Sequence, residues 1–261
     1  MCYTLITGAS SGIGYEFTKI CARKGHNLIL VARNGTKLQQ IAGELQQQYP
    51  VKMVIIPQDL SEPDAADHIF KRIHNESLTV ENLINNACFY IRGPFMDTPW
   101  EEELALIQLQ CISQIKLIKL LLPDMKLMGR GRVLNVCSTG SFVPGPFNAI
   151  YCAAKSFLLS FSEALGEELK GTGISISALC PGGTNTPFQD LHSRKKSLLN
   201  PLMEASKVAE IGYRGFMRGK RVIIPGQMNN LQVFALRFLP RRMITRLSGK
   251  AVYQSIQTTQ T

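Results

Sequence analysis

The feature that most constrains this chain is a glycine-rich turn that joins a short apolar strand to a helix at the very start. The strand-like run Tyr3–Ile6 leads into residues 7–14, Thr-Gly-Ala-Ser-Ser-Gly-Ile-Gly, and an apolar-periodic helix follows. Free N–H groups and the helix dipole make such a turn a ready pyrophosphate site. Gly8 permits the sharp turn of the backbone, and Gly12 lets the ligand approach the backbone closely. Gly14 lets the helix pack against the strand. The spacing Gly-x-x-x-Gly-x-Gly differs from the common Gly-x-Gly-x-x-Gly fingerprint.

Strand-like runs alternate with helical patterns along the rest of the chain. This alternation predicts an α/β fold: a single-domain, Rossmann-like, doubly wound parallel sheet with helices on both faces, spanning residues 1–261. The runs are almost continuously apolar, as expected of strands that are buried on both sides. The expected strands after the first are Leu28–Ala32, Met53–Pro57, Leu83–Asn86, Val133–Val136, Ser175–Cys180 and Val222–Ile224.

The residue after the second strand indicates which dinucleotide is bound. A carboxylate at this place holds a ribose 2′-hydroxyl, whereas an arginine suits a 2′-phosphate, and here the residue is Arg33. Lys37 lies one turn further on, and Ser10 adds a hydroxyl nearby. This favours NADP(H) over NAD(H). Asp59 and Leu60, after the third strand, are placed to meet the adenine edge.

A second motif combines Tyr151 and Lys155 with Ser138, thirteen residues before the tyrosine. Residues four apart lie on one face of a helix, and an ammonium beside a phenol favours proton release by the phenol. A serine hydroxyl there is able to hold a carbonyl oxygen beside the proton donor. Alone, the Tyr-x-x-x-Lys spacing is weak, because tyrosines and lysines on amphipathic helices are usually surface residues.

Together these pieces resemble the short-chain dehydrogenase/reductase family. The resemblance runs from Tyr3 to about Phe188 and includes the glycine turn, Asp59-Leu60, Asn85-Asn86-Ala87, Ser138, Tyr151-x-x-x-Lys155 and Pro181-Gly182. Within the roughly 250-residue branch, the segments at 31–33, 159–165 and 171–173 resemble a bacterial subgroup of NADP-dependent reductases. The resemblance implies that the cofactor is contacted by Gly8, Ser10, Ser11, Gly12, Ile13, Gly14, Arg33, Asp59, Leu60, Asn86, Ala87, Tyr151, Lys155, Pro181, Gly182, Thr184 and Thr186.

The resemblance also implies a mechanism, in which hydride moves between nicotinamide and a carbonyl carbon. Tyr151 is then the general acid, or the base in the oxidative direction. Lys155 lowers the tyrosine pKa and bonds the nicotinamide ribose, and Ser138 orients the carbonyl. Family members of this branch commonly form dimers or tetramers through the helices that contain Gln110 and Tyr151, so a homodimer or homotetramer is expected.

Two residues depart from the family pattern. Gln110 stands where the family has an asparagine that holds a proton-relaying water, and the extra methylene alters that geometry. Cys88 stands where the family has glycine, beside the expected cofactor. Neither change removes a proton-transfer group, so an oxidoreductase is the favoured interpretation. The alternative is an NADPH-binding regulatory or sensor protein with weak or no turnover.

The last third of the chain carries the positive charge. Residues 1–190 hold 16 basic and 17 acidic residues, whereas residues 191–261 hold 13 basic and 2 acidic ones, which accounts for the net charge of +10. Residues 188–210 are expected to form a substrate lid in which apolar side chains lie beside a basic patch. Such a lid suits a largely apolar carbonyl substrate with an anionic handle, for example an acyl thioester on coenzyme A or a carrier protein. A solvated basic loop is the plainer interpretation.

Residues 234–250 form a basic amphipathic pattern with no acidic residue. Such a helix either lies on an anionic membrane surface, docks on an acidic partner, or packs on its own domain or across a dimer interface. Because no aromatic residues interleave with the cations as in single-strand-binding proteins, we expect no nucleic-acid partner.

The seven cysteines include no Cys-x-x-Cys pair and no Cys/His cluster, so neither a metal site nor a disulfide framework is expected. The first strand begins within a few residues of Met1, which leaves no room for a signal peptide. The longest apolar stretch, residues 112–122, is interrupted by Lys116 and Lys119 and predicts no membrane span. A cytoplasmic protein is expected.

Overall fold

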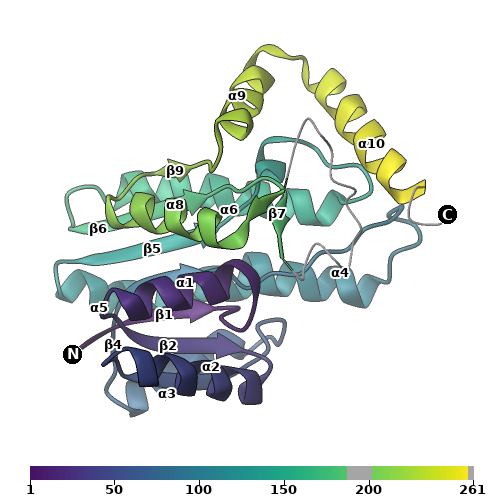
Figure 1. The fold of residues 1–261 in the computed structure, drawn as a ribbon. Coiled ribbons are helices and arrows are strands. Elements are labelled where there is room, and N and C mark those ends of the chain that lie inside the picture. Colours follow the sequence, from purple (N-terminus) through teal and green to yellow (C-terminus); the bar gives the residue numbers. More distant parts are fainter. Residues whose placement is uncertain (187–201, 258–261) are drawn as a thin grey trace.

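The computed structural model describes residues 1–186 and 202–257, and its centre is a parallel sheet (Figure 1). The seven strands lie in the order β3-β2-β1-β4-β5-β6-β9, and every neighbouring pair is parallel. Their bounds are β1 Cys2–Thr7, β2 Asn27–Ala32, β3 Met53–Pro57, β4 Thr79–Asn85, β5 Gly131–Val136, β6 Ile174–Leu179 and β9 Val222–Ile223. The predicted doubly wound α/β fold is therefore confirmed.

The strand order reverses between β1 and β4, which are neighbours in the sheet although two strands separate them in the chain. In open parallel sheets, ligands bind in the crevice at the carboxyl ends of the strands at this switch point. The glycine turn follows β1 and residues 85–88 follow β4. The fold thus brings two of the predicted motifs to one edge of the sheet.

Helices cover both faces, because each face of the sheet is apolar and must be buried. One face packs against α1 Gly12–Arg23, α2 Gly35–Gln48 and α8 Ala205–Met217, with Phe17, Leu38 and Phe216 in the core. The other face packs against α3 Ala65–Asn75, α5 Gln114–Leu127 and α6 Ala149–Glu168, with Ile69 and Leu117 in the core.

The helix α4 Trp100–Ile107 continues through the π-helical segment η1 Gln108–Ser113 into α5. The run Trp100–Leu127 is long and apolar enough, by length and composition, to cross a bilayer. Leu106, Leu117 and Leu121 within it are nevertheless buried against the rest of the protein. This is the packing of a core helix, which passes the same test of length and composition.

The structure adds elements that the sequence patterns do not reveal. A second small sheet pairs β7 Thr184–Asn185 with β8 Met203–Glu204. Most of the predicted lid (188–210), namely residues 188–201, lies outside the described residues. The last part of that range is the beginning of α8, where Val208 and Ala209 are buried in the core.

The C-terminal arm, residues 227–257, stands apart from the sheet and its layers (Figure 1). It comprises α9 Gln227–Ala235, the short 3-10 helix η3 Leu236–Phe238 and α10 Arg241–Gln257. α9 rises from the end of β9, and α10 runs back beside the edge of the sheet that carries the predicted site. α10 begins directly after Pro240, whose carbonyl oxygen accepts hydrogen bonds from the N–H groups of Met243 and Ile244.

Candidate active site

The glycine turn after β1 is closed so tightly that side chains are excluded from it. Gly8 and Gly12 have φ angles of +65° and +54°, in the left-handed region that favours glycine. Gly14 has ordinary helical surroundings, but a Cβ atom there would lie 2.2 Å from the carbonyl oxygen of Gly8. The backbone therefore agrees with the predicted reasons for Gly8 and Gly14, and the close approach of a ligand at Gly12 stays a prediction.

The amino end of α1 is open toward solvent and fits an anion. Its N-cap residue, Ser11, makes no capping hydrogen bond with its side chain, and the first turn holds no acidic residue. The first N–H groups of a helix have no partner within it, and the dipole places partial positive charge there. This turn has the donors that a pyrophosphate needs. Ser10 and Ile13, also predicted contacts, are half-buried in the same turn.

Residues from β4 hold the turn in place. The side-chain amide of Asn86 donates to the carbonyl oxygens of Thr7, at 3.0 Å, and Gly8, at 3.2 Å. The Thr7 hydroxyl accepts from the backbone N–H groups of Asn86 and Ala87, at 2.9 and 3.0 Å. Asn86 and Ala87 are predicted cofactor contacts, and here they also fix the ends of β1 and β4 to each other. The contribution of Thr7 was not predicted.

Arg33 lies at the carboxyl end of β2 with an exposed guanidinium group. Its side chain is 79% exposed, and its nearest acidic partner is Asp59, with 3.9 Å between Nη1 and Oδ2. Asp59 in turn accepts from the backbone and hydroxyl of Ser61, while Leu60 is buried in the core. A long, weakly held cation at this edge is free to turn toward a phosphate.

Ser138, Tyr151 and Lys155 come together at the carboxyl end of β5. Ser138 follows that strand and its hydroxyl forms a hydrogen bond with the Tyr151 phenol. Lys155, one turn further along α6, has its Nζ 5.9 Å from the centroid of the tyrosine ring. The Lys155 side chain is only 1% exposed and donates to the carbonyl oxygen of Val136 at 2.7 Å. The spacing of the motif therefore produces the predicted constellation.

The electrostatics of Tyr151 differ from the prediction in one respect. Desolvation by the surrounding protein raises the pKa of Tyr151 well above its ordinary value of 10.0, and the thiol of Cys88 acts in the same direction. The hydrogen bond with Ser138 lowers the pKa, but less than burial raises it. Lys155 faces the Val136 carbonyl instead of the phenol oxygen. The tyrosine is consequently held in the protonated form that a general acid requires.

A buried network of hydrogen-bonded polar side chains supports the site, and it was not predicted from the sequence. The Asn85 amide donates to Asn135 Oδ1 at 3.0 Å, and the Asn135 amide donates to the Ser162 hydroxyl at 2.8 Å. All three side chains are buried, so the network links β4 and β5 to α6, the helix that carries Tyr151 and Lys155. The signal available in the sequence was one asparagine inside the apolar run of β5.

Gln110 lies in the π-helical segment between α4 and α5 and is fully buried. Its Nε2 donates to the carbonyl oxygen of Phe89 at 3.1 Å, and its Oε1 has no partner among the described residues. π-Helical turns frequently occur at functional sites. The glutamine therefore braces the segment after β4, which also contains Cys88, and its role in a proton relay stays a prediction.

The segment after β6 lies beside the glycine turn. The carbonyl oxygen of Pro181 accepts from the N–H of Thr139, next to Ser138. Gly182 is closely covered by Asn229 of α9, since a Cβ atom there would lie 2.6 Å from Asn229 Oδ1. Thr186 is buried and approaches Gly12, where an added Cβ atom would lie 3.2 Å from its methyl group. Thr184 is buried as well.

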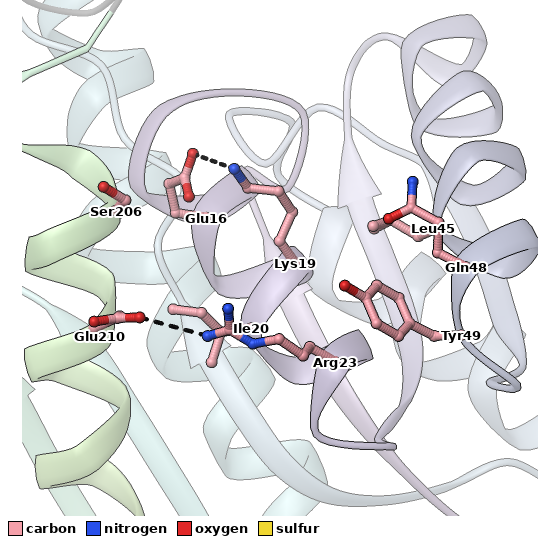
Figure 2. A pocket seen from close by; sticks show the side chains of 9 residues that line it. All are labelled: Glu16, Lys19, Ile20, Arg23, Leu45, Gln48, Tyr49, Ser206 and Glu210. Atoms are coloured by element: carbon pink, nitrogen blue, oxygen red, sulfur yellow. Dashed lines mark hydrogen bonds and ion pairs between the residues drawn. The ribbon is translucent and has the colours of Figure 1, made fainter.

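One hollow of the surface lies away from these residues (Figure 2). It is a cavity of about 270 Å³ between α1, α2 and α8. Figure 2 shows that two ion pairs, Glu16 with Lys19 and Arg23 with Glu210, occupy its wall. None of the predicted catalytic or cofactor-binding residues lines it, so we assign it no part in the site.

Within residues 1–186 and 202–257, no group of three or more His, Cys, Asp and Glu side chains is placed to hold a metal ion. All seven cysteines are free thiols. Burial raises the pKa of the Cys21 thiol to about 12.

Comparisons with known proteins agree with this geometry. A family model described as short chain dehydrogenase matches residues 3–197. The chain is 33% identical over 183 residues to a 7beta-hydroxysteroid dehydrogenase of Collinsella aerofaciens, which covers 70% of this chain and 69% of the relative. It is 35% identical over 203 residues to a very-long-chain 3-oxoacyl-CoA reductase of Phaeosphaeria nodorum, which covers 76% of this chain and 59% of that longer protein.

Solved structures are similar over almost the whole chain. A structure from a study of 7beta-hydroxysteroid dehydrogenase stereoselectivity has a TM-score of 0.87 at 28% identity and covers 95% of this chain and 96% of its own. A short-chain dehydrogenase from Sphingobium yanoikuyae in complex with NADPH has a TM-score of 0.82 at 31% identity and covers 91% and 93%. The chain belongs to the short-chain dehydrogenase family, and it is an oxidoreductase that uses a nicotinamide cofactor and acts on CH–OH and C=O groups.

Proposed function

We propose that this protein is an NADP(H)-dependent oxidoreductase that transfers a hydride between nicotinamide and the carbonyl or alcohol group of a largely apolar substrate. The observation that carries the proposal is the cluster of Ser138, Tyr151 and the buried Lys155 at the carboxyl end of β5. Burying a lysine side chain costs free energy, so a buried lysine calls for a functional reason. Lys155 lies one helical turn from the hydrogen-bonded phenol of Tyr151, and a role in proton transfer supplies that reason.

The residues of the chain divide the work between them. Ser138 donates to the substrate carbonyl oxygen and so holds it beside the phenol. Tyr151 delivers its proton to that oxygen as negative charge develops, or removes the hydroxyl proton in the oxidative direction. Burial raises the pKa of Tyr151 further above neutral pH, so the phenol carries the proton that the reductive direction requires. Lys155 would hydrogen-bond the nicotinamide ribose, and Gln110 and the buried hydrogen bonds of Asn135 hold this region in place.

The residues at the sheet edge fit a dinucleotide phosphate. The open amino end of α1 would hold the pyrophosphate, and Arg33 with Ser10 would hold a 2′-phosphate. Asp59 and Leu60 would lie at the adenine, and Pro181, Gly182, Thr184 and Thr186 at the nicotinamide. When bound, the cofactor supplies or accepts the hydride. Support for NADP(H) comes from the exposed Arg33 and from the similar structure that contains NADPH.

For the substrate we propose a bulky apolar carbonyl compound, with an acyl thioester on coenzyme A or a carrier protein as one candidate class. The similar proteins named for hydroxysteroid and 3-oxoacyl-CoA chemistry support this choice. Aromatic side chains also gather at the tyrosine, where Tyr90 packs edge-on against Tyr151 with 5.0 Å between the ring centroids. The predicted lid at residues 188–210, with its basic patch, remains part of the proposal.

Two further parts of the proposal concern the surroundings of the protein. A homodimer or homotetramer is supported by the exposed Trp100, Leu104, Ile112 and Phe157 on the helices that carry Gln110 and Tyr151. A cytoplasmic location is supported by the seven free thiols.

The second candidate function, an NADPH sensor with weak turnover, is favoured by two side chains. Gln110 bonds Phe89 in place of the family's relay asparagine, and Cys88 contributes to the raised pKa of Tyr151. Both would slow proton exchange without harming nucleotide binding.

A single experiment separates the two functions. NADPH binding is followed by fluorescence, and oxidation is then measured with hydrophobic ketones, aldehydes and 3-oxoacyl thioesters. Tyr151→Phe should abolish turnover and leave NADPH affinity nearly unchanged, whereas Tyr49→Phe, which removes the same atom far from the site, should leave both intact. Equal slow oxidation by wild type and Tyr151→Phe across all substrates would contradict the enzyme proposal and favour the sensor.

A further inference from the structure

We infer that the C-terminal arm is a docking surface for an anionic lipid membrane. The inference goes beyond the proposed function and is independent of it, because it concerns exposed side chains that form no part of the proposed catalytic or cofactor site and is tested with lipid alone. It rests on the exposed apolar side chains of the arm, on its charge, and on the way α10 is fixed to the body.

Large apolar side chains recur at helical spacing and face solvent on both helices of the arm. Phe234 and Phe238 pack edge-on with 5.3 Å between their ring centroids, yet they are 55% and 73% exposed. Leu247 on α10 is 55% exposed. Single exposed apolar residues are ordinary, but a contiguous apolar surface marks an interaction site. The exposed members are Met228, Leu231, Phe234, Phe238, Met243 and Leu247.

The charge of the arm has one sign. After Glu210 the sequence contains no acidic residue, whereas it contains nine basic residues. Five of these belong to the arm and are exposed: Arg237, Arg241, Arg242, Arg246 and Lys250. None of the five forms an ion pair with any part of the chain that the structure describes. These cations therefore remain available to an anionic partner.

α10 uses only one face to attach to the body. The hydroxyl of Ser248 donates to the carbonyl oxygen of Pro144 at 2.7 Å, and Ile244 is buried. Gly249 lies against Pro146, so a larger residue there would meet the proline ring. The alternative that residues 234–250 pack on their own domain therefore holds for the attached face of α10 only. The opposite face carries Met243 and Leu247 beside Arg246 and Lys250, and all four side chains are exposed.

Charge complementarity favours an anionic lipid surface over a second copy of the chain as the binding partner of this face. If the arm packed against the arm of a second copy, its five cations would meet a surface without any acidic residue, because the sequence contains none after Glu210. An anionic bilayer attracts all five, and it accepts phenylalanine, leucine and methionine side chains below the headgroups. Figure 1 shows that the arm projects beyond the layers of the sheet, so it is able to meet a flat surface.

The test is sedimentation of the purified full-length protein with phosphatidylcholine vesicles, with or without phosphatidylserine. We expect binding to the phosphatidylserine vesicles, little binding to pure phosphatidylcholine, and a loss of binding as salt is raised. Arg242→Gln with Arg246→Gln should weaken partitioning by about 25-fold, from about fivefold per cation. Lys24→Gln with Lys126→Gln, which removes two exposed cations elsewhere, is the matched control and should bind like the wild type.

A second variant and a second measurement keep the test decisive. Leu247→Gln preserves the charge and should weaken binding through lost apolar contact, while the circular dichroism of each variant should match the wild type. Equal binding to both vesicle types, no binding to either, or equal losses in the arm variant and the control would overturn the inference. It would also be overturned if the arm variants changed the oligomeric state measured without lipid, because the face would then join copies of the chain.

Discussion

Replacing Gly14 by alanine tests whether the tight turn after β1 is what creates the cofactor site. The new Cβ atom would lie 2.2 Å from the Gly8 carbonyl oxygen and 2.4 Å from Nδ2 of Asn86. Ordinary contacts begin near 3.5 Å, so the turn must move by about 1 Å. Overpacking of this kind costs about 1–3 kcal/mol, and the hydrogen bond from Asn86 to Gly8 adds about 1 kcal/mol when it breaks.

We therefore expect the Tm of Gly14→Ala to fall by roughly 5–10 °C and its Kd for NADPH to rise at least tenfold. Gly43→Ala is the matched control, because Gly43 is an exposed residue of α2 and a Cβ atom there meets nothing within 4 Å. That change should stabilise the protein by about 0.5–1 kcal/mol and leave NADPH binding unchanged. Thermal unfolding and fluorescence titration measure both quantities. If Gly14→Ala behaved like Gly43→Ala, the argument for the turn would be refuted.

Three further predictions concern single side chains. Arg33→Ala should raise the Kd for NADPH tenfold or more and leave that for NADH within about twofold, and equal losses for the two nucleotides would contradict a 2′-phosphate contact. Gln110→Asn should lower the unfolding free energy by about 1 kcal/mol in urea titrations, because the shorter side chain cannot reach Phe89; an unchanged midpoint would contradict this. Cys21 has a folded-state pKa of about 12 against 9.0 when free, so its contribution to stability is complete below pH 9 and is lost as the pH rises toward 12. Between pH 8 and 10 the wild type should therefore lose about 1.4 kcal/mol more unfolding free energy than Cys21→Ala, and parallel curves would argue against the shift.

The parts of the fold that follow from local physics were predictable from the sequence. Met53–Pro57 agrees with β3 residue for residue, and the other expected strands overlap those observed, because strands buried on both faces must be continuously apolar. The glycine turn was recognisable because only glycine tolerates the backbone of Gly8 and Gly12. The helical period predicted that Tyr151 and Lys155 share one face of a helix, and the other motifs of the family resemblance identified the pair as catalytic candidates.

Other parts depend on contacts between distant residues and were not predictable. The π-helical turn at Gln110 arises inside an otherwise regular helix, and no local pattern marks it. The direction of Lys155 is set by the carbonyl of Val136, nineteen residues away in the chain. The link from Asn85 to Asn135 joins neighbouring strands that are fifty residues apart. A sequence pattern places such residues on an element but does not say which partner each will find.

The proposed catalytic site is buried, whereas the proposed membrane-binding arm is exposed. Substitutions can therefore test the two proposals separately. Lys155, Asn135 and Gln110 are all at most 1% exposed, so changes there alter packing and the proton-transfer geometry together. The cations of the C-terminal arm are exposed, and surface substitutions of this kind usually change stability by less than about 0.5 kcal/mol. The arm touches the loop before Tyr151 through Ser248 and Tyr253, whereas Arg242 and Arg246 are exposed and form no ion pair with the described residues. Removing those two charges should therefore leave the turnover of a water-soluble substrate unchanged while it weakens vesicle binding about 25-fold, because sites without shared partners act additively.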